Sequence, residues 1–122
     1  MPGHLPNSLL LAVAALLGTV AMPALAEAHA HLVTSSPAAN SSGSAPDDIE
    51  LRFSEAPLAR FSGVQLLTAS GAAVPASTRA ADGNTLSIVP NAALRPGTYT
   101  VRWHVVTADT HRVQGALAFT VR

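Results

Sequence analysis

The feature that most constrains the fold is a Pro-Gly bend followed by a long alternating segment. Pro96-Gly97 predicts a type II turn. A tyrosine two residues after the glycine, Tyr99, can donate its hydroxyl to backbone upstream, an arrangement typical of the tyrosine corner in Greek-key β-sandwiches. From this tyrosine to Val105, every second residue is large and apolar, including Trp103, so the segment is predicted to be a half-buried strand.

Several shorter segments repeat this alternation between turn signals and show no helical period. Strands are predicted at residues 32–35, 49–53, 61–67, 85–89 and 113–121; residues 38–48 are predicted to be a loop, and residues 74–79 are ambiguous. We therefore predict one all-β domain, an immunoglobulin-like Greek-key β-sandwich of about seven strands. Its expected core comprises Phe53, Leu66, Ile88, Val101, Trp103, Leu117 and Phe119.

The N-terminal segment predicts export. Ser8–Ala21 is almost wholly apolar, and Met22–Ala28 has small residues at alternate positions, which is typical of a cleavable signal peptide. We expect residues 1–28 to be removed and residues 29–122 to form the mature domain, although cuts before Glu27 or His31 satisfy the same rule. An uncleaved membrane anchor is the alternative, because the apolar run is close to spanning length.

Composition excludes several classes of function. Seven arginines balance seven acidic residues and there is no lysine, which argues against a nucleic-acid-binding surface. The chain has no Gly-x-Ser-x-Gly motif and no glycine-rich phosphate loop. It has no cysteine, and both methionines fall in the predicted signal peptide, so the mature domain carries no soft metal ligand.

The histidines carry the remaining chemistry. Asp109 and His111 stand two residues apart beside a β connection, where side chains of an extended backbone share a face. A cut before His29 makes it the first residue, and its α-amine and imidazole can then chelate a metal. Nitrogen and oxygen ligands in this combination suit Cu(II), with Zn(II) as the competing interpretation. His31 could instead complete a separate N-terminal chelate, while His104 is interpreted as an exposed strand residue.

Asp109 and His111 each also have an ordinary structural explanation. Asp109 alone is more often a turn residue, because aspartate bonds nearby backbone in turns. His111 alone is more often a surface histidine.

Together these motifs resemble one protein family, the CopC/PcoC periplasmic copper-resistance proteins. The resemblance rests on His29–Leu32, Ser36-Pro37-Ala38, Ile49–Glu55, Gly97–Tyr99, Trp103, Val105–His111 and Gly115. It implies an immunoglobulin-like or cupredoxin-like sandwich that binds Cu(II) through His29, Asp109 and His111, with Glu55 near the metal. Some members bind Cu(I) in a methionine-rich loop, but residues 63–91 contain no methionine here, so we expect no Cu(I) site.

The function expected from this resemblance is a periplasmic copper carrier or buffer with one Cu(II) site, monomeric and not an enzyme. Its expected partner is an inner-membrane copper transporter of the CopD type or another periplasmic copper protein. Two alternatives stay open. An N-terminal histidine plus a second histidine also resembles the histidine brace of oxidative copper enzymes, although Asp109 would occupy a position needed for oxygen. The other is a metal-free sandwich interaction module.

Overall fold

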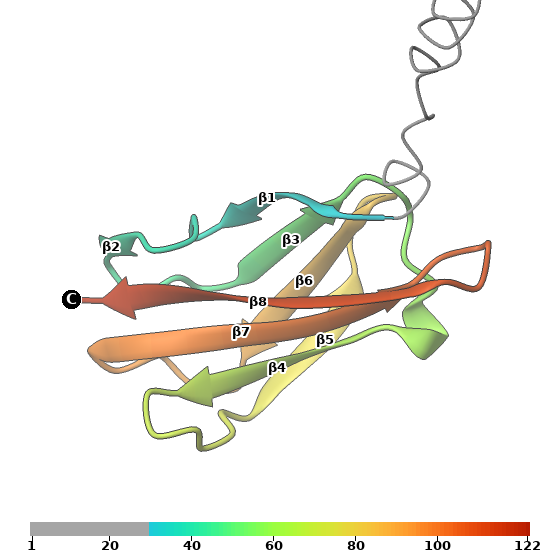
Figure 1. Cartoon of the computed structure of the whole chain (residues 1–122). Coiled ribbons are helices and arrows are strands. Elements are labelled where there is room, and N and C mark those ends of the chain that lie inside the picture. Colours follow the sequence, from blue (N-terminus) through green and yellow to red (C-terminus); the bar gives the residue numbers. More distant parts are fainter. Residues whose placement is uncertain (1–29) are drawn as a thin grey trace, which may run out of the picture.

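The computed structural model describes residues 30–122, which form two four-stranded β-sheets packed face to face (Figure 1). The sheet orders are β1-β3-β6-β5 and β2-β8-β7-β4. The predicted signal peptide and His29 lie outside the described residues. The strands are β1 Leu32–Ser36, β2 Ser42–Gly43, β3 Ile49–Phe53, β4 Gly63–Thr68, β5 Ala76–Ala80, β6 Thr85–Pro90, β7 Gly97–Val106 and β8 Arg112–Val121, and one short 3-10 helix, η2, spans Ala59–Phe61.

This architecture confirms the predicted all-β Greek-key sandwich. Named neighbours in the sheets pair antiparallel, except that β2 runs parallel to β8. Within residues 30–122 no helix is long and apolar enough to cross a membrane.

Three predicted boundaries need correction. The segment 38–48, predicted to be a loop, contains the two-residue strand β2, which pairs with Thr120 and Val121. The strand predicted from Phe61 begins at Gly63, because Phe61 ends η2. The ambiguous segment 74–79 forms β5 over Ala76–Ala80, at the edge of its sheet.

The core lies between the two sheets and follows the alternation of the sequence. In β3 the residues Ile49, Leu51 and Phe53 are buried and the two between them are exposed. All seven predicted core residues are buried. The indole of Trp103 meets the ring of Phe53 edge-on at a centroid distance of 5.0 Å, which joins the sheets near one end of the sandwich.

The bend before β7 has the predicted tyrosine contact and a different turn geometry. The hydroxyl of Tyr99 donates a hydrogen bond to the carbonyl oxygen of Arg95 at 2.7 Å, which confirms the tyrosine contact. Gly97 has a φ of 151°, whereas a type II turn requires roughly +80° at that position. The type II assignment is therefore wrong.

Trp103 depends on a glycine across the ladder. The register of β7 and β8 places Gly115 opposite Trp103. A Cβ atom at position 115 would lie 2.6 Å from Cζ2 of the indole, which is far inside van der Waals contact. The absence of a side chain at Gly115 therefore provides the space that the indole fills.

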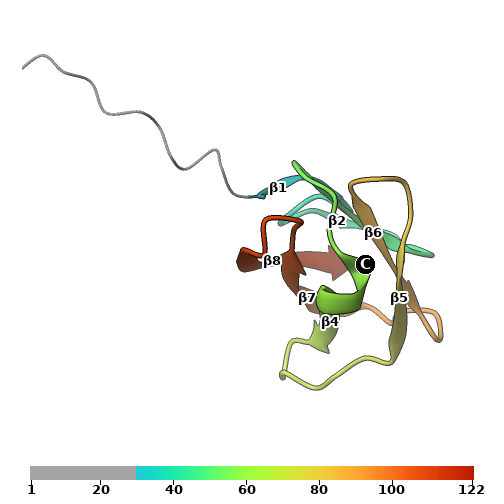
Figure 2. The same cartoon turned by 90° about the vertical axis from the view of Figure 1, so that its right-hand side faces the viewer.

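One end of the sandwich gathers three segments that are distant in sequence. Ser54 and His31 are linked twice: the amide of Ser54 donates to the carbonyl of His31 at 2.9 Å, and the amide of His31 donates to Oγ of Ser54 at 3.0 Å. The connection from Ser54 then crosses to the other sheet, where the amide of Leu58 donates to the carbonyl of Val106 at 2.8 Å. The start of β1, this connection and the end of β7 thus meet at one end (Figures 1 and 2).

Candidate metal site

The candidate site lies in the tight connection between β7 and β8. The amide of Thr110 donates to the carbonyl of Thr107 at 2.8 Å, and the amide of Thr107 donates to the carbonyl of His111 at 3.3 Å. Thr110 has a φ of 67°, which is uncommon for a β-branched residue. Asp109 and His111 are therefore brought together by a turn, and the extended backbone expected from the sequence is wrong.

The turn nevertheless places the two predicted ligands in direct contact. Oδ2 of Asp109 lies 3.0 Å from Nδ1 of His111. Oδ1 of Asp109 accepts hydrogen bonds from the hydroxyl of Thr107 at 2.5 Å and from the amide of His111 at 3.2 Å. One carboxylate oxygen is thus held by the turn, and the other faces the imidazole.

These contacts keep Asp109 charged. The hydroxyl of Thr107, then the backbone and side chain of His111, lower the pKa of Asp109 from 3.8 to about 2. Both side chains remain accessible, with 42% of the Asp109 side chain and 58% of the His111 side chain exposed. The site therefore offers a permanent carboxylate and an imidazole to solvent at ordinary pH.

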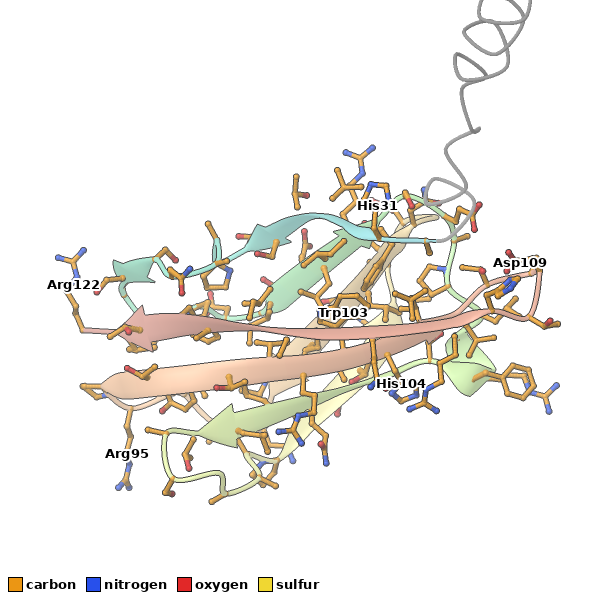
Figure 3. The ribbon with its side chains drawn as sticks, in the orientation of Figure 1. His31, Arg95, Trp103, His104, Asp109 and Arg122 are labelled. Carbon is orange, nitrogen blue, oxygen red and sulfur yellow. The ribbon has the colours of Figure 1, made fainter. Side chains whose placement is uncertain are left out.

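The other predicted site residues are distributed around this end. His29 precedes the described residues. Figure 3 shows His31 beside the start of β1 and Asp109 at the tip of the connection between β7 and β8. Glu55 follows Ser54 in the connection between the sheets and makes no hydrogen bond or ion pair with any of residues 30–122. Over that range, no three histidine or acidic side chains lie close enough together to hold a metal ion.

Two polar residues of this end were not identified from the sequence. Thr107 is 2% exposed and orients Asp109, and Ser54 fixes the backbone of His31. A threonine two residues before an aspartate is a local pattern in which the hydroxyl can bond a nearby polar group, so the sequence weakly indicates the role of Thr107. Nothing in the sequence indicates the role of Ser54, because its partner is 23 residues away.

His104 is confirmed to face away from the core, but it is half-buried, so the expectation of an exposed residue is wrong. Trp103 and His104 leave β7 in opposite directions, and His104 is not among the groups around Asp109 (Figure 3). Its ring lies over Gly63 of β4, where a Cβ atom would be 2.9 Å from Cε1 of the imidazole.

Comparisons with known proteins agree on one family. A family model described as the CopC domain matches residues 32–122. The chain is 41% identical to copper resistance protein C of Pseudomonas syringae pv. tomato over 107 residues, which cover 81% of this chain and 85% of that protein. It is 43% identical over 100 residues to protein YobA of Escherichia coli strain K12, covering 78% and 80% of the two chains.

Solved structures give the same result. PcoC from Escherichia coli, described as a methionine-rich copper resistance protein, matches with a TM-score of 0.73 at 38% identity, covering 77% of this chain and 99% of that one. CopC from Methylosinus trichosporium OB3b matches with a TM-score of 0.69 at 30% identity, covering 76% and 93%.

Proposed function

Since this chain belongs to the CopC family of copper resistance proteins, we propose that it is a periplasmic carrier or buffer for a single Cu(II) ion. The observation that carries the proposal is the contact of Asp109 with His111 at the exposed end of a rigid sheet. The family relation supports copper as the cargo, and the nitrogen and oxygen donors support the divalent ion.

The geometry of the pair suits two neighbouring metal ligands. With metal–donor bonds of about 2.0–2.1 Å, two donors at a right angle lie roughly 2.9 Å apart, and Oδ2 of Asp109 lies 3.0 Å from Nδ1 of His111. Thr107 and the amide of His111 hold the other carboxylate oxygen, so Oδ2 is directed toward the imidazole. We propose that Asp109 binds through Oδ2 and His111 through Nδ1.

The third ligand group in this proposal is His29, through its α-amine and imidazole after signal-peptide cleavage. Support comes from the anchoring of the next residues: Ala30 is 2% exposed, and His31 is bonded twice to Ser54 at the end that carries Asp109. His29 is therefore covalently attached to a segment fixed at the correct end. Glu55, in the same region, is proposed to lie near the bound metal without holding it.

The choice of Cu(II) over Cu(I) follows from the donors. Residues 30–122 contain neither methionine nor cysteine, whereas the structurally similar PcoC is described as methionine rich. Soft thioether and thiolate ligands are the ones that select Cu(I). Reduction of the metal should therefore weaken binding, which provides a route for release to a copper transporter of the CopD type or to another periplasmic copper protein.

The carrier function is distinguished from oxidative copper chemistry by Asp109. In this proposal its carboxylate takes a coordination position beside His111, where an oxygen-activating site would need an open one. We accordingly propose that the protein is not an enzyme. Incubation of the copper-loaded protein with reductant, oxygen and polysaccharide should release no oxidised sugars, and steady product formation would favour the enzyme.

The decisive experiment is a Cu(II) titration of the exported, correctly processed protein, with intact mass establishing the first residue. One equivalent should quench the fluorescence of Trp103, the only tryptophan, and electron paramagnetic resonance should report the nitrogen ligands. His111→Ala should weaken binding by more than about 100-fold, whereas His104→Ala should leave it unchanged. If binding survives His111→Ala and is lost with His31→Ala, a terminal chelate is the true site; a mature chain beginning at Glu27 would also refute the model.

A further inference from the structure

The outer face of the sheet β2-β8-β7-β4 carries a shallow groove that contains none of the proposed copper ligands. Its volume is about 640 Å³. The register pairs His104 of β7 with Gly63 of β4, and Arg102 with Gln65. The polar side chains of this face therefore lie next to a position that has no side chain. The polar residues and the glycine that shape it are Gly63, Gln65, Arg102, His104, Arg112 and Gln114.

The charged side chains that line this groove are all positive. Arg102 and Arg112 are exposed, and no acidic residue lines the groove. Between residues 30 and 122 no arginine forms an ion pair, since the one salt bridge there joins His111 and Asp109. Each guanidinium carries five N–H donors in a planar fork that matches a carboxylate. The groove therefore presents two arginines whose natural complement is a pair of carboxylates.

An apolar patch adjoins the groove at the end near the candidate metal site. Leu58, just before η2, and Phe61, its last residue, are 38% and 59% exposed, and the guanidinium of Arg60 lies 5.8 Å from the centre of the Phe61 ring. The patch is fixed to β7, because the amide of Val106 donates to Oγ of Ser62 at 3.0 Å and β4 begins at the next residue.

We propose that this combined surface, the groove around Arg102, His104 and Arg112 together with Leu58 and Phe61, docks an acidic segment of a partner protein. Exposed aromatic and arginine side chains beside one another are the residues that contribute most to protein interfaces. An acidic peptide fits better than nucleic acid or an anionic membrane, which require a denser basic face than two arginines and a balanced overall charge supply.

The surface lies beside the proposed copper ligands, so docking there would serve copper transfer; this role rests on the proposed function. Arg112 directly follows His111, so a segment bound in the groove ends beside the proposed copper ligands. A partner held there could receive or deliver the ion without its release into solution. Docking itself depends only on the sheet face and does not require copper.

The test uses the mature protein without metal and a capped hexaglutamate peptide, with capped hexaglutamine as the uncharged control. In low salt, hexaglutamate should shift the amide resonances of residues 63–65 and 114–116, and hexaglutamine should not. Arg102→Gln and Arg112→Gln should each weaken binding by at least about fivefold, and added salt should weaken it further. Arg79→Gln is the matched control, because Arg79 is exposed on β5 of the opposite sheet.

Three results overturn the proposal. One is an absence of shifts at millimolar hexaglutamate, and another is equal weakening by Arg79→Gln. The third is preferential binding to vesicles of phosphatidylcholine and phosphatidylglycerol through the same arginines, which would assign the groove to a membrane. The Cu(II) titration of Arg102→Gln separates the two proposals: unchanged copper binding with lost peptide binding supports the groove, whereas failure of copper binding in the unaltered protein refutes the copper proposal alone.

Discussion

Replacement of Gly115 by alanine tests how the sandwich makes room for its tryptophan. The new Cβ atom would lie 2.6 Å from Cζ2 and 2.9 Å from Cε2 of Trp103, so either the indole or β8 must move. Trp103 is 7% exposed and is wedged against Phe53, which leaves the ring little freedom. Overpacking of this kind costs about 1–3 kcal/mol, and removing a flexible glycine from the unfolded chain returns about 0.4–1 kcal/mol.

The net expectation is a loss centred on about 1 kcal/mol and reaching at most about 2.6 kcal/mol, and each kcal/mol corresponds to a fall in melting temperature of roughly 4–8 °C for a domain of this size. Thermal unfolding followed by circular dichroism measures it. Gly43→Ala is the matched control, because a Cβ atom at Gly43 meets nothing within 4 Å. That variant should melt at or slightly above the temperature of the unaltered protein.

A double-mutant cycle isolates the contact from other effects of the substitution. Phenylalanine at position 103 lacks the distal part of the indole, including Cζ2, so Gly115→Ala should cost much less in the Trp103→Phe protein than in the parent. A coupling free energy of about 1 kcal/mol or more is expected for residues in direct contact. Equal costs in both backgrounds, or a Gly115→Ala protein as stable as Gly43→Ala, would show that the close approach has no energetic consequence.

Three further predictions concern the turn between β7 and β8. Since the hydroxyl of Thr107 is the largest cause of the low pKa of Asp109, Thr107→Val should raise this pKa toward 3.8 in a carboxyl NMR titration of the metal-free protein, and Thr107→Ser should keep it near 2. The pKa of Asp109 is lower in the folded than in the unfolded chain, so its contribution to stability should be complete above about pH 4 and lost as the pH falls toward 2; Asp109→Asn should abolish this part of the acid dependence. Thr110→Asn should stabilise the protein by about 0.5–1 kcal/mol in thermal unfolding, because asparagine tolerates a positive φ better than threonine does, whereas Thr100→Asn, in the extended β7, should destabilise it.

The sequence predicts the fold well where burial alternates strictly. The strand at Ile49–Phe53 has the predicted bounds because each inward residue is large and apolar and each outward one is charged. The sequence predicts the fold less well where a segment becomes a strand only through pairing with a distant strand. The two-residue strand β2 exists only because the end of β8 pairs with it, and nothing in Ser42-Gly43 itself indicates a strand.

For the candidate site, the sequence indicates which side chains can act as metal ligands. It does not indicate the backbone conformation that brings them together. Residue type and spacing indicate Asp109 and His111 as ligands, but their spacing brings them together on one face only in an extended backbone, which this connection does not have. The actual contact arises because Thr110 adopts a positive φ, which a threonine does not signal. The role of Thr107 depends on its burial, and the role of Ser54 on a contact between distant segments, so both require three-dimensional structure.

In the proposed copper site, the two hydrogen bonds between His31 and Ser54 would affect how fast a bound ion escapes. If His29 is a ligand as proposed, its backbone can lie at most about 7 Å from the anchor at His31. Asp109 and His111 would then meet it at an effective concentration in the millimolar range or above. Loss of an ion from Asp109 and His111 would then be followed by rapid recapture rather than escape. Ser54→Ala, which removes one of the two bonds, should accordingly speed copper dissociation more than it slows association.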